Sequence, residues 1–304
     1  MTAPSVLLVG GNGFLGQALA RALSSTGWQV GVLSRGEMPE PLPGVTWHCG
    51  SQDDPGVVAP LLDRYGAVVH LASTSTPGTY ADRPARECEE NLLPLLRFVE
   101  ISERRPEIPL VFISSGGAIY GQPLELPVGE SQRLAPISNH AAGKAAAESF
   151  LGVQAARGHR ITVLRPSNVY GPGQHLKPGF GVIRTMLEHV RRGTAMTIWG
   201  NGETFRDYLY VDDFVEAMRR VLEAPAVGTF NLGSGIGCSL NRLRSIVEEV
   251  TGRPLAVSFE PVRSVDVKGV VLDSTMCASI YGWTPTVSLE EGVRLTWVWV
   301  QGLP

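Results

Sequence analysis

The first half of the chain alternates short apolar runs with segments of helical periodicity. The apolar runs occupy residues 5–10, 28–33, 67–72 and 109–115, and the helical patterns occupy residues 13–26, 54–64 and 84–104. A helical pattern over 139–157 and an apolar run over 161–166 extend the series. Apolar strands that alternate with helices are typical of a parallel sheet with crossover helices. The pattern therefore predicts an α/β fold with a doubly wound parallel sheet.

Beyond about residue 170 the texture of the chain changes. The segments YGPGQHLKPGFG and WGNGETFRDY are rich in glycine and proline, and helical patterns return at 212–224 and 239–251. At 304 residues the chain is long enough for a large domain and a smaller lobe. We predict a main domain over residues 1–170, to which later segments cross back. Residues 171–304 are expected to form mainly a smaller mixed α/β lobe that caps the carboxyl edge of the sheet.

Composition and charge exclude several classes of protein. Apolar residues make up 43% of the chain, and no apolar run approaches the ~20 residues that a membrane helix needs. The N-terminal stretch MTAPSVLLVG has no basic segment, so we expect no secretory signal. The formal net charge is −3, and no basic cluster is interleaved with aromatic residues, which argues against a nucleic-acid partner. We expect a cytoplasmic protein with no membrane or nucleic-acid partner that binds a small molecule.

Cysteine and histidine spacings predict no disulfide framework and no metal site. The cysteines are scattered without CxxC spacing at Cys49, Cys88, Cys238 and Cys277. Metal-ligand spacing is also absent among His48, His159, His175 and His189.

A glycine-rich loop separates the first predicted strand from the first predicted helix. Its glycines permit a tight turn, close approach of backbone N–H groups to a pyrophosphate, and close packing of the helix on the strand. A glycine triplet alone is a weak signal, but the strand-to-helix context is the one that a dinucleotide site requires. We therefore predict a Rossmann-like domain that binds a dinucleotide. The loop residues expected to contact it are Gly10, Asn12, Gly13, Phe14, Leu15 and Gly16.

The end of the second predicted strand bears on the choice between NAD and NADP. A carboxylate is expected there to bind the ribose 2′-hydroxyl of NAD, but the chain has Ser34 and Arg35. A guanidinium group can bind a 2′-phosphate through two hydrogen bonds. Ser34 and Arg35 are therefore expected to contact the cofactor, and NADP is favoured over NAD. Alternatively, Arg35 is a solvated loop residue whose charge Glu37 neutralises.

Further stretches resemble the extended short-chain dehydrogenase/reductases, in particular their nucleotide-sugar epimerase/dehydratase group. The matching stretches are GGNGFLG (10–16), VVHLAS (68–73), ENLLPLL with Asn91, ISSGGAIYG (113–121), Lys144, LRPSNVYGPG (164–173), FRDYLYVDD (205–213), FNLGSG (230–235) and GWTP (282–285). The resemblance implies a sheet that binds NAD or NADP and a C-terminal lobe that binds a nucleoside-diphosphate sugar. It also implies a homodimer formed through helices 84–104 and 139–157.

The resemblance implies roles for single residues as well. Lys144 matches a lysine that binds the nicotinamide ribose and lowers the pKa of a catalytic tyrosine. His140 stands where that tyrosine is expected. Gly116 stands where many relatives have Ser or Thr, so Ser114 or Ser115 is expected to serve instead. The remaining implied contacts are Leu71 and Ala72 for the cofactor, and Tyr120, Asn168, Arg206 and Arg263 for the substrate.

His140 and Lys144 are expected one helical turn apart on the same face of a helix. An imidazole with an unperturbed pKa of about 6.5 is a competent base at neutral pH, and a nearby ammonium group favours its neutral form. Histidine could therefore take a proton from a sugar hydroxyl, directly or through a water. The alternative is that His140 is a packing or solvent-facing residue in a protein without turnover.

The loop after residue 113 helps to separate the possible reactions. The family's dehydratases have Thr-Asp-Glu where this chain has Gly116, Gly117 and Ala118, so dehydration is disfavoured. We predict a nucleotide-sugar epimerase that acts at hexose C4 by reversible hydride transfer with tightly bound NAD(P). The alternatives are an NADPH-dependent nucleotide 4-keto-sugar reductase and, in another class, a catalytically silent dinucleotide-binding sensor or partner subunit.

Overall fold

The computed structural model of the 304-residue chain describes residues 3–36, 41–177, 179–261 and 268–304. The chain forms two compact units. Unit 1 comprises Met1–Ser115, Ser138–Arg165 and Val215–Phe230, and unit 2 comprises Gly116–Ile137, Pro166–Phe214 and Asn231–Pro304. The chain therefore passes repeatedly between the units. The sequence predicts one main boundary at residue 170, with later segments that cross back.

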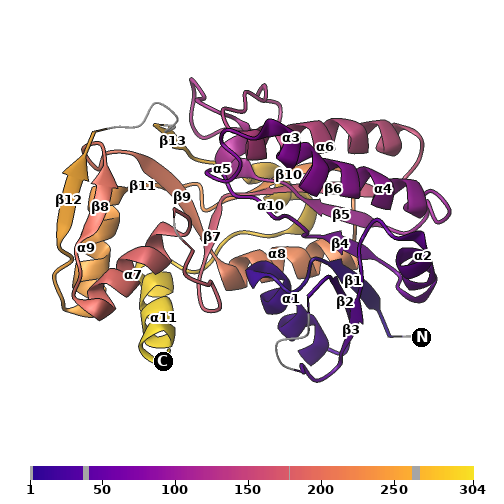
Figure 1. Ribbon diagram of the computed structural model, residues 1–304, viewed down its shortest axis with the longest axis horizontal. Coiled ribbons are helices and arrows are strands. Elements are labelled where there is room, and N and C mark those ends of the chain that lie inside the picture. Colours follow the sequence, from indigo (N-terminus) through magenta and orange to yellow (C-terminus); the bar gives the residue numbers. More distant parts are fainter. Residues whose placement is uncertain (1–2, 37–40, 178, 262–267) are drawn as a thin grey trace. The chain divides into compact units, whose positions relative to one another are not determined.

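Unit 1 is built on a seven-stranded sheet with the spatial order β10-β6-β5-β4-β1-β2-β3 (Figure 1). Its strands are β1 (Ser5–Val9), β2 (Gln29–Ser34), β3 (Val45–Cys49), β4 (Val68–His70), β5 (Leu110–Ile113), β6 (Ile161–Pro166) and β10 (Gly228–Leu232). The neighbouring strands from β3 to β6 run parallel. The strand order reverses between β1 and β4, and ligands of such sheets bind at the carboxyl ends of the strands at this switch point.

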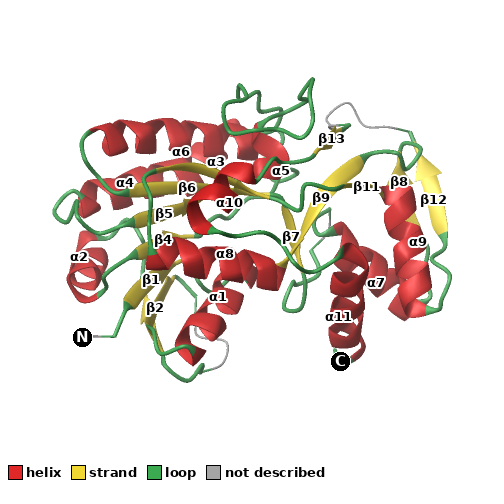
Figure 2. Ribbon diagram, turned by 180° about the vertical axis from the view of Figure 1, so that it is seen from behind, coloured by secondary structure: helices red, strands yellow, loops and turns green. Residues whose placement is uncertain are grey.

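Helices cover both faces of the sheet in unit 1 (Figures 1 and 2). One face carries α1 (Phe14–Ser25) and α8 (Val211–Glu223), and the other carries α4 (Leu93–Ser102) and α6 (Asn139–Ala156). The Ser138 side chain caps α6 by accepting a hydrogen bond from the Ala141 N–H at 3.2 Å. The arrangement confirms the predicted Rossmann-like, doubly wound α/β fold.

The main apolar core of unit 1 lies between the sheet and three helices, α4, α6 and α2 (Pro55–Arg64). Leu7 and Phe112 from the sheet join Leu62, Phe98 and Leu151 from the helices, and all five are at most 2% exposed. Burying an apolar side chain of this size contributes about 1.5–3 kcal/mol relative to leaving it exposed. This packing fixes α4 and α6 on the sheet, and both helices border the candidate active site.

The helix predicted over 84–104 is interrupted. It consists of α3 (Pro84–Glu87), a π-helical turn η1 (Cys88–Leu92) and α4. The Leu93 N–H bonds to the Cys88 carbonyl five residues earlier, which defines the π-turn. Such turns are rare and often lie at functional sites.

Unit 2 contains the remaining elements. Its strands are β7 (Asn168–Tyr170), β8 (Met196–Trp199), β9 (Phe205–Tyr210), β11 (Gly237–Ser239), β12 (Val257–Glu260) and β13 (Gly269–Val270). Strand β9 pairs with β7, β11 and β13, and β12 pairs with β8. The helices are α5 (Gly116–Ile119), α7 (Val182–Arg192), α9 (Leu240–Thr251), α10 (Thr275–Tyr281) and α11 (Leu289–Gln301), of which α7, α9 and α11 contact one another.

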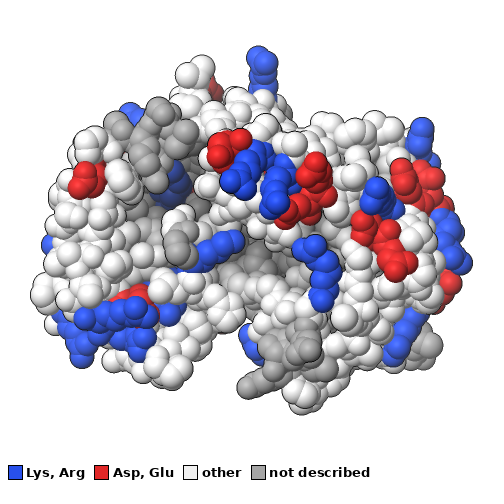
Figure 3. All heavy atoms as spheres, viewed as in Figure 1, with Lys and Arg blue, Asp and Glu red and all other residues white. Residues whose placement is uncertain are grey.

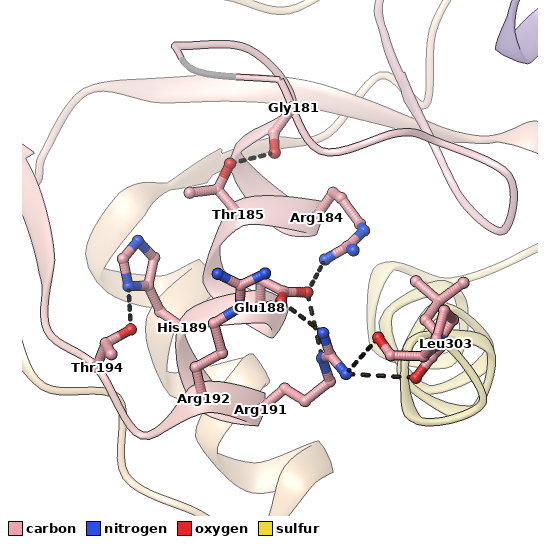
Figure 4. Close-up of polar contacts among 10 residues, drawn as sticks. Gly181, Arg184, Thr185, Glu188, His189, Arg191, Arg192, Thr194 and Leu303 are labelled. Atoms are coloured by element: carbon pink, nitrogen blue, oxygen red, sulfur yellow. Dashed lines mark hydrogen bonds and ion pairs between the residues drawn. The ribbon is translucent and has the colours of Figure 1, made fainter.

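A buried carboxylate on α7 gathers three arginines in unit 2 (Figure 4). Glu188 is 3% exposed and accepts hydrogen bonds from Arg184 at 2.7 Å, from Arg191 at 2.8 Å and from Arg192. These bonds, Arg191's first, lower the pKa of Glu188 to about 2, so the carboxylate stays ionised at ordinary pH. Arg191 also donates to the backbone carbonyls of Leu303 and Pro304. The cluster thereby holds the segment after α11 against α7.

Acidic and basic side chains lie next to one another in several places on the face drawn in Figure 3. Exposed pairs of this kind include Arg104 with Asp63 at 3.3 Å and Arg86 with Glu90 at 3.2 Å. Each contributes only about 0–1 kcal/mol, so the stability of the fold depends mainly on the cores. In the part of the chain that the structure describes, no helix has the length and apolar character needed to cross a membrane.

Candidate active site

The glycine loop joins β1 to α1 in unit 1. Gly10 has a φ of +77°, and a Cβ atom there would lie 2.5 Å from Ala72 Cα. A Cβ atom at Gly16 would lie 2.4 Å from Gly11 Cα. Neither position can hold a side chain without moving backbone. The structure thus brings the loop against Ala72, which follows Leu71 at the end of β4, so two separate stretches assigned to the cofactor meet.

The start of α1 suits the pyrophosphate of a dinucleotide. Among the described residues, no side chain caps α1 at Gly13, and its first turn holds no acidic residue. A Cβ atom at Gly13 would make only an ordinary van der Waals contact, at 3.7 Å from the Gly10 carbonyl oxygen. Helix N-termini present N–H donors and the positive end of the helix dipole, which together bind phosphate groups. The residues of this loop therefore fit the group that the fold implies.

The end of β2 borders the same loop. Ser34 donates a hydrogen bond from Oγ to the Gly36 carbonyl at 3.0 Å, and a Cβ at Gly36 would lie 3.8 Å from Asn12 Nδ2. Arg35 is exposed between them. The structure therefore groups Ser34 and Arg35 with the loop residue Asn12, while their contacts with a cofactor stay predictions.

His140 lies in the first turn of α6 and is 7% exposed. Its ring nitrogen Nδ1 lies 2.9 Å from the hydroxyl oxygen of Ser75, in the segment after β4. This hydrogen bond ties the ring to the segment that follows β4. His140 is therefore not a solvent-facing residue. A packing role without turnover remains as the alternative to catalysis.

A polar network continues from Ser75 into the interrupted helix. The side-chain amide of Asn91 donates one N–H to Ser75 Oγ at 3.2 Å and another to Glu87 Oε1 at 3.1 Å. Its oxygen accepts from the Thr74 N–H at 2.8 Å. Glu87 precedes the π-turn and Asn91 lies within it, and the Glu87 side chain reaches Gly143 on α6. Within unit 1, the network joins the segment after β4, the interrupted helix and the start of α6.

Ser75 and Glu87 are absent from the site residues predicted from the sequence. The one available signal is the spacing of Glu87 and Asn91, which places them on the same face of a helical segment. Ser75 lies in the polar stretch STST, where the sequence does not distinguish it from its neighbours.

Lys144 lies one turn beyond His140 on α6. Its ammonium group donates to the Ile113 carbonyl at the end of β5 at 2.8 Å and lies 4.7 Å from the centre of the Phe112 ring. Burial lowers the pKa of Lys144 to about 8, while the charges of Glu87 and Glu148 act to raise it. Glu148 itself forms a buried ion pair with Arg165 at 2.5 Å. Lys144 is thus close to losing its proton at mildly basic pH.

Ser114 and Ser115 follow β5 directly. Ser114 is 5% exposed, and within the described ranges its hydroxyl oxygen makes no hydrogen bond. Ser115 is half-buried. A buried hydroxyl without a partner is unusual and often marks a functional position. The choice between the two serines stays a prediction.

The residues predicted to bind substrate belong to unit 2. Tyr120 is 1% exposed and donates its hydroxyl to Asn231 Oδ1 at 2.7 Å. Asn168 donates to the Asp207 carbonyl at 3.0 Å, and Arg206 donates to the Phe205 carbonyl at 2.7 Å. Their roles toward a sugar nucleotide stay predictions. Arg263 lies outside the described residues.

Comparisons with known proteins place this fold and site in a family. The NAD-dependent epimerase/dehydratase family matches residues 6–233. A UDP-glucose 4-epimerase from Thermotoga maritima, solved with UDP-glucose, is 33% identical with a TM-score of 0.91, and the match covers 98% of both chains. The UDP-glucose 4-epimerase of Thermus thermophilus, solved with NAD, is 31% identical with a TM-score of 0.91, and the match covers 99% of this chain and 100% of that one.

A curated relative with another activity is also similar over nearly the whole chain. The dTDP-4-dehydro-6-deoxyglucose reductase of Escherichia coli is 28% identical over 301 residues, which are 95% of each protein. The chain belongs to the NAD-dependent epimerase/dehydratase family. It is an enzyme of the extended short-chain dehydrogenase/reductase type, which confirms the resemblance seen in its motifs.

Proposed function

We propose that the protein is a nucleotide-sugar epimerase that acts at C4 of a hexose by reversible hydride transfer. The proposal rests chiefly on the pair His140 and Lys144, which lie on one face of α6 in the unit that carries the glycine loop. Both solved relatives described above are UDP-glucose 4-epimerases, which supports a nucleoside-diphosphate sugar as substrate.

His140 is the proposed base. When bound, NAD(P) supplies a group that accepts a hydride from C4 and returns it. The proton of the C4 hydroxyl would go to Nε2 of His140, since Nδ1 is held by Ser75. Ser114 or Ser115 would hold the sugar oxygen, and Lys144 would place a positive charge beside the developing alkoxide. Arg206 would bind the diphosphate of the sugar nucleotide, and Asn168 would contact the substrate.

Reduction of a 4-keto sugar by NADPH is the second candidate. It needs the same residues but an exchangeable cofactor, and the similarity to a dTDP-4-dehydro-6-deoxyglucose reductase favours keeping it. Exposed Arg35 beside the glycine loop supports NADP over NAD in either reaction, because a guanidinium group can bind the 2′-phosphate. A dinucleotide-binding protein without turnover is the third candidate.

A homodimer is proposed through α4 and α6. Large apolar side chains are exposed on these helices: Leu93 is 42% exposed, Phe150 49% and Val153 52%. Covering them by the same helices of a second copy would remove this apolar area from water. Light scattering of the wild type and of Phe150→Glu tests this, and a wild-type monomer would contradict it.

One set of assays distinguishes the three candidate functions. The purified protein is first analysed for bound NAD or NADP, and its thermal stability is measured with UDP-, GDP-, dTDP- and CDP-sugars plus each cofactor. An epimerase retains cofactor and converts a stabilising sugar to its C4 epimer without net change in reduced nicotinamide. A reductase consumes added NADPH with a 4-keto sugar. Binding of cofactor with neither reaction would contradict the proposed enzymatic function.

A further inference from the structure

A buried carboxyl group lies beside His140 and has no part in the proposed mechanism so far. Glu87, at the end of α3, is 3% exposed. Its Oε1 accepts the Asn91 amide at 3.1 Å, whereas Oε2 makes no hydrogen bond of normal geometry with any described residue. A buried carboxylate without full hydrogen bonding is costly, and such groups often have a functional role.

Space for this carboxyl group depends on a glycine in α6. A Cβ atom at Gly143 would lie 2.8 Å from Glu87 Oε1 and 2.9 Å from its Cγ. Glycine in the interior of a helix costs about 0.5–1 kcal/mol relative to alanine. Gly143 therefore lets the carboxyl group sit against the helix turn that separates His140 from Lys144.

The hydrogen bonds leave one proton without a fixed position. Ser75 Oγ accepts from Asn91, and its single hydroxyl proton can be donated to His140 Nδ1 or toward Glu87. The Ser75 hydroxyl is close enough to Glu87 to favour its ionised form, although burial acts more strongly and raises the pKa of Glu87. The other charges that act on Glu87 are Lys144 on α6, which lowers its pKa, and Glu90 on η1, which raises it.

We propose that Glu87 is a positioning residue that acts on His140 through Ser75. This role rests on the proposed function of His140. For Nε2 to accept the sugar proton, the neutral ring must carry its own proton on Nδ1 and donate it to Ser75 Oγ. The Ser75 hydroxyl proton then points toward Glu87, whose negative charge favours this tautomer and stabilises the imidazolium that forms. The proton transfer breaks the sugar O–H bond and forms the Nε2–H bond, and Glu87 gains no proton. Asn91 bonds to both Ser75 and Glu87 and holds them in place.

The first test measures the titration of the His140 ring by NMR in the protein as purified, with its signal assigned through His140→Asn. Glu87→Gln keeps the shape and removes the charge, and it should lower the pKa of His140 by about one unit, because a nearby negative charge favours the imidazolium form. The matched control is Glu89→Gln, an exposed carboxylate on the same π-turn that lies outside the network. It should leave the His140 titration where it is in the wild type.

The second test uses turnover of the stabilising nucleotide sugar. The acid limb of the kcat profile should move to lower pH in Glu87→Gln by the same amount as the ring titration, and Glu89→Gln should not move it. Gly143→Ala pushes the carboxyl group away and should act in the same direction. Equal His140 titrations in Glu87→Gln and Glu89→Gln would overturn the role of Glu87 even if the wild type is fully active. If Glu87→Gln shifts the His140 titration but the wild type shows no turnover, the proposed function would be overturned. The role of Glu87 in catalysis would then be overturned with it.

Discussion

His140 and Lys144 share one face of α6, but their surroundings act on them differently. The His140 ring is oriented by a hydrogen bond to Ser75 at 2.9 Å. The Lys144 ammonium is buried, and its pKa falls to about 8 because the low-dielectric surroundings disfavour its charge. An imidazole titrates near neutral pH without help, so the site does not depend on the lysine to create a base. In the proposed mechanism, the remaining role of Lys144 is to place a positive charge beside the sugar oxygen.

Replacing His140 tests the proposed base. His140→Ala should lower kcat by at least about 100-fold, because general base catalysis contributes factors of about 10² to 10⁴. His140→Tyr should retain or raise activity if the phenol can reach the sugar from this position. His175→Ala is a suitable control, since His175 is exposed and belongs to unit 2. Unchanged turnover in His140→Ala would remove the histidine from the mechanism.

Burial of Lys144 should appear in the pH dependence of stability. Its pKa is lowered from 10.5 to about 8 in the folded state, so between these values the unfolded chain binds more protons and stability rises with pH. Relative to Lys144→Met, the wild-type free energy of unfolding should therefore increase by up to about 3 kcal/mol across that range. Urea unfolding of both proteins at several pH values measures the difference. A difference that does not vary with pH would show that the lysine is not buried as described.

At the scale of elements, local pattern predicts most of unit 1. Strands such as β1 and β6 are buried along nearly their whole length, so their sequences are uniformly apolar and easily recognised. Strand β3 was not predicted because its residues at the sheet edge are exposed or half-buried and do not form an apolar run. The π-turn also escaped, since its hydrophobic spacing differs from that of an α-helix by a single residue per turn. Pattern therefore predicts which elements exist better than it predicts their irregularities.

Alanine substitutions at Gly13 and Gly16 should have different effects on stability and on cofactor binding. Gly16→Ala should destabilise the protein by about 1–3 kcal/mol, because its Cβ would overlap the Gly11 backbone. Gly13→Ala should change thermal stability little, since its Cβ would make only an ordinary van der Waals contact with the Gly10 carbonyl oxygen, but should weaken dinucleotide binding because the methyl group adds bulk where the pyrophosphate is predicted to bind. Gly152→Ala, with nothing near its Cβ position in α6, should stabilise by about 0.5–1 kcal/mol. Thermal unfolding and cofactor titration of the three variants separate these effects, and tight cofactor binding by Gly13→Ala would contradict the proposed loop role.

At the scale of the whole molecule, the chain weaves between its two units. Residues 116–137 belong to unit 2, and Val215–Phe230 return to unit 1 with most of α8 and β10. The change of texture near residue 170 marks where glycine-rich segments begin, but it carries no information about which later helix returns to the sheet. The meeting of Ser75, Glu87 and His140 is hidden for a similar reason. It depends on His140 meeting two segments that lie far earlier in the sequence, so only the packed fold brings them together.

A fragment of residues 1–170 should therefore not fold independently. It lacks β10, which pairs with β6, and it lacks α8, which covers one face of the sheet. Strand β6 is buried along its whole length and would become an exposed apolar edge, which favours aggregation. Circular dichroism and size-exclusion chromatography of the fragment, compared with the full chain, measure the outcome. A monomeric fragment with cooperative unfolding would contradict this reading of the two units.

The π-turn between α3 and α4 separates the orientation of Glu87 from the packing of Phe98 on the sheet. Successive residues of an α-helix are rotated by about 100°, so the loss of one residue such as Glu89 would make the helix regular and swing everything before it by about that angle. Phe98 would keep its anchorage on the sheet while Glu87 turned away from α6. The extra residue of the π-turn therefore sets the direction of the Glu87 carboxylate independently of the packing of Phe98. A one-residue deletion there would be a far more severe change than most substitutions at the same positions.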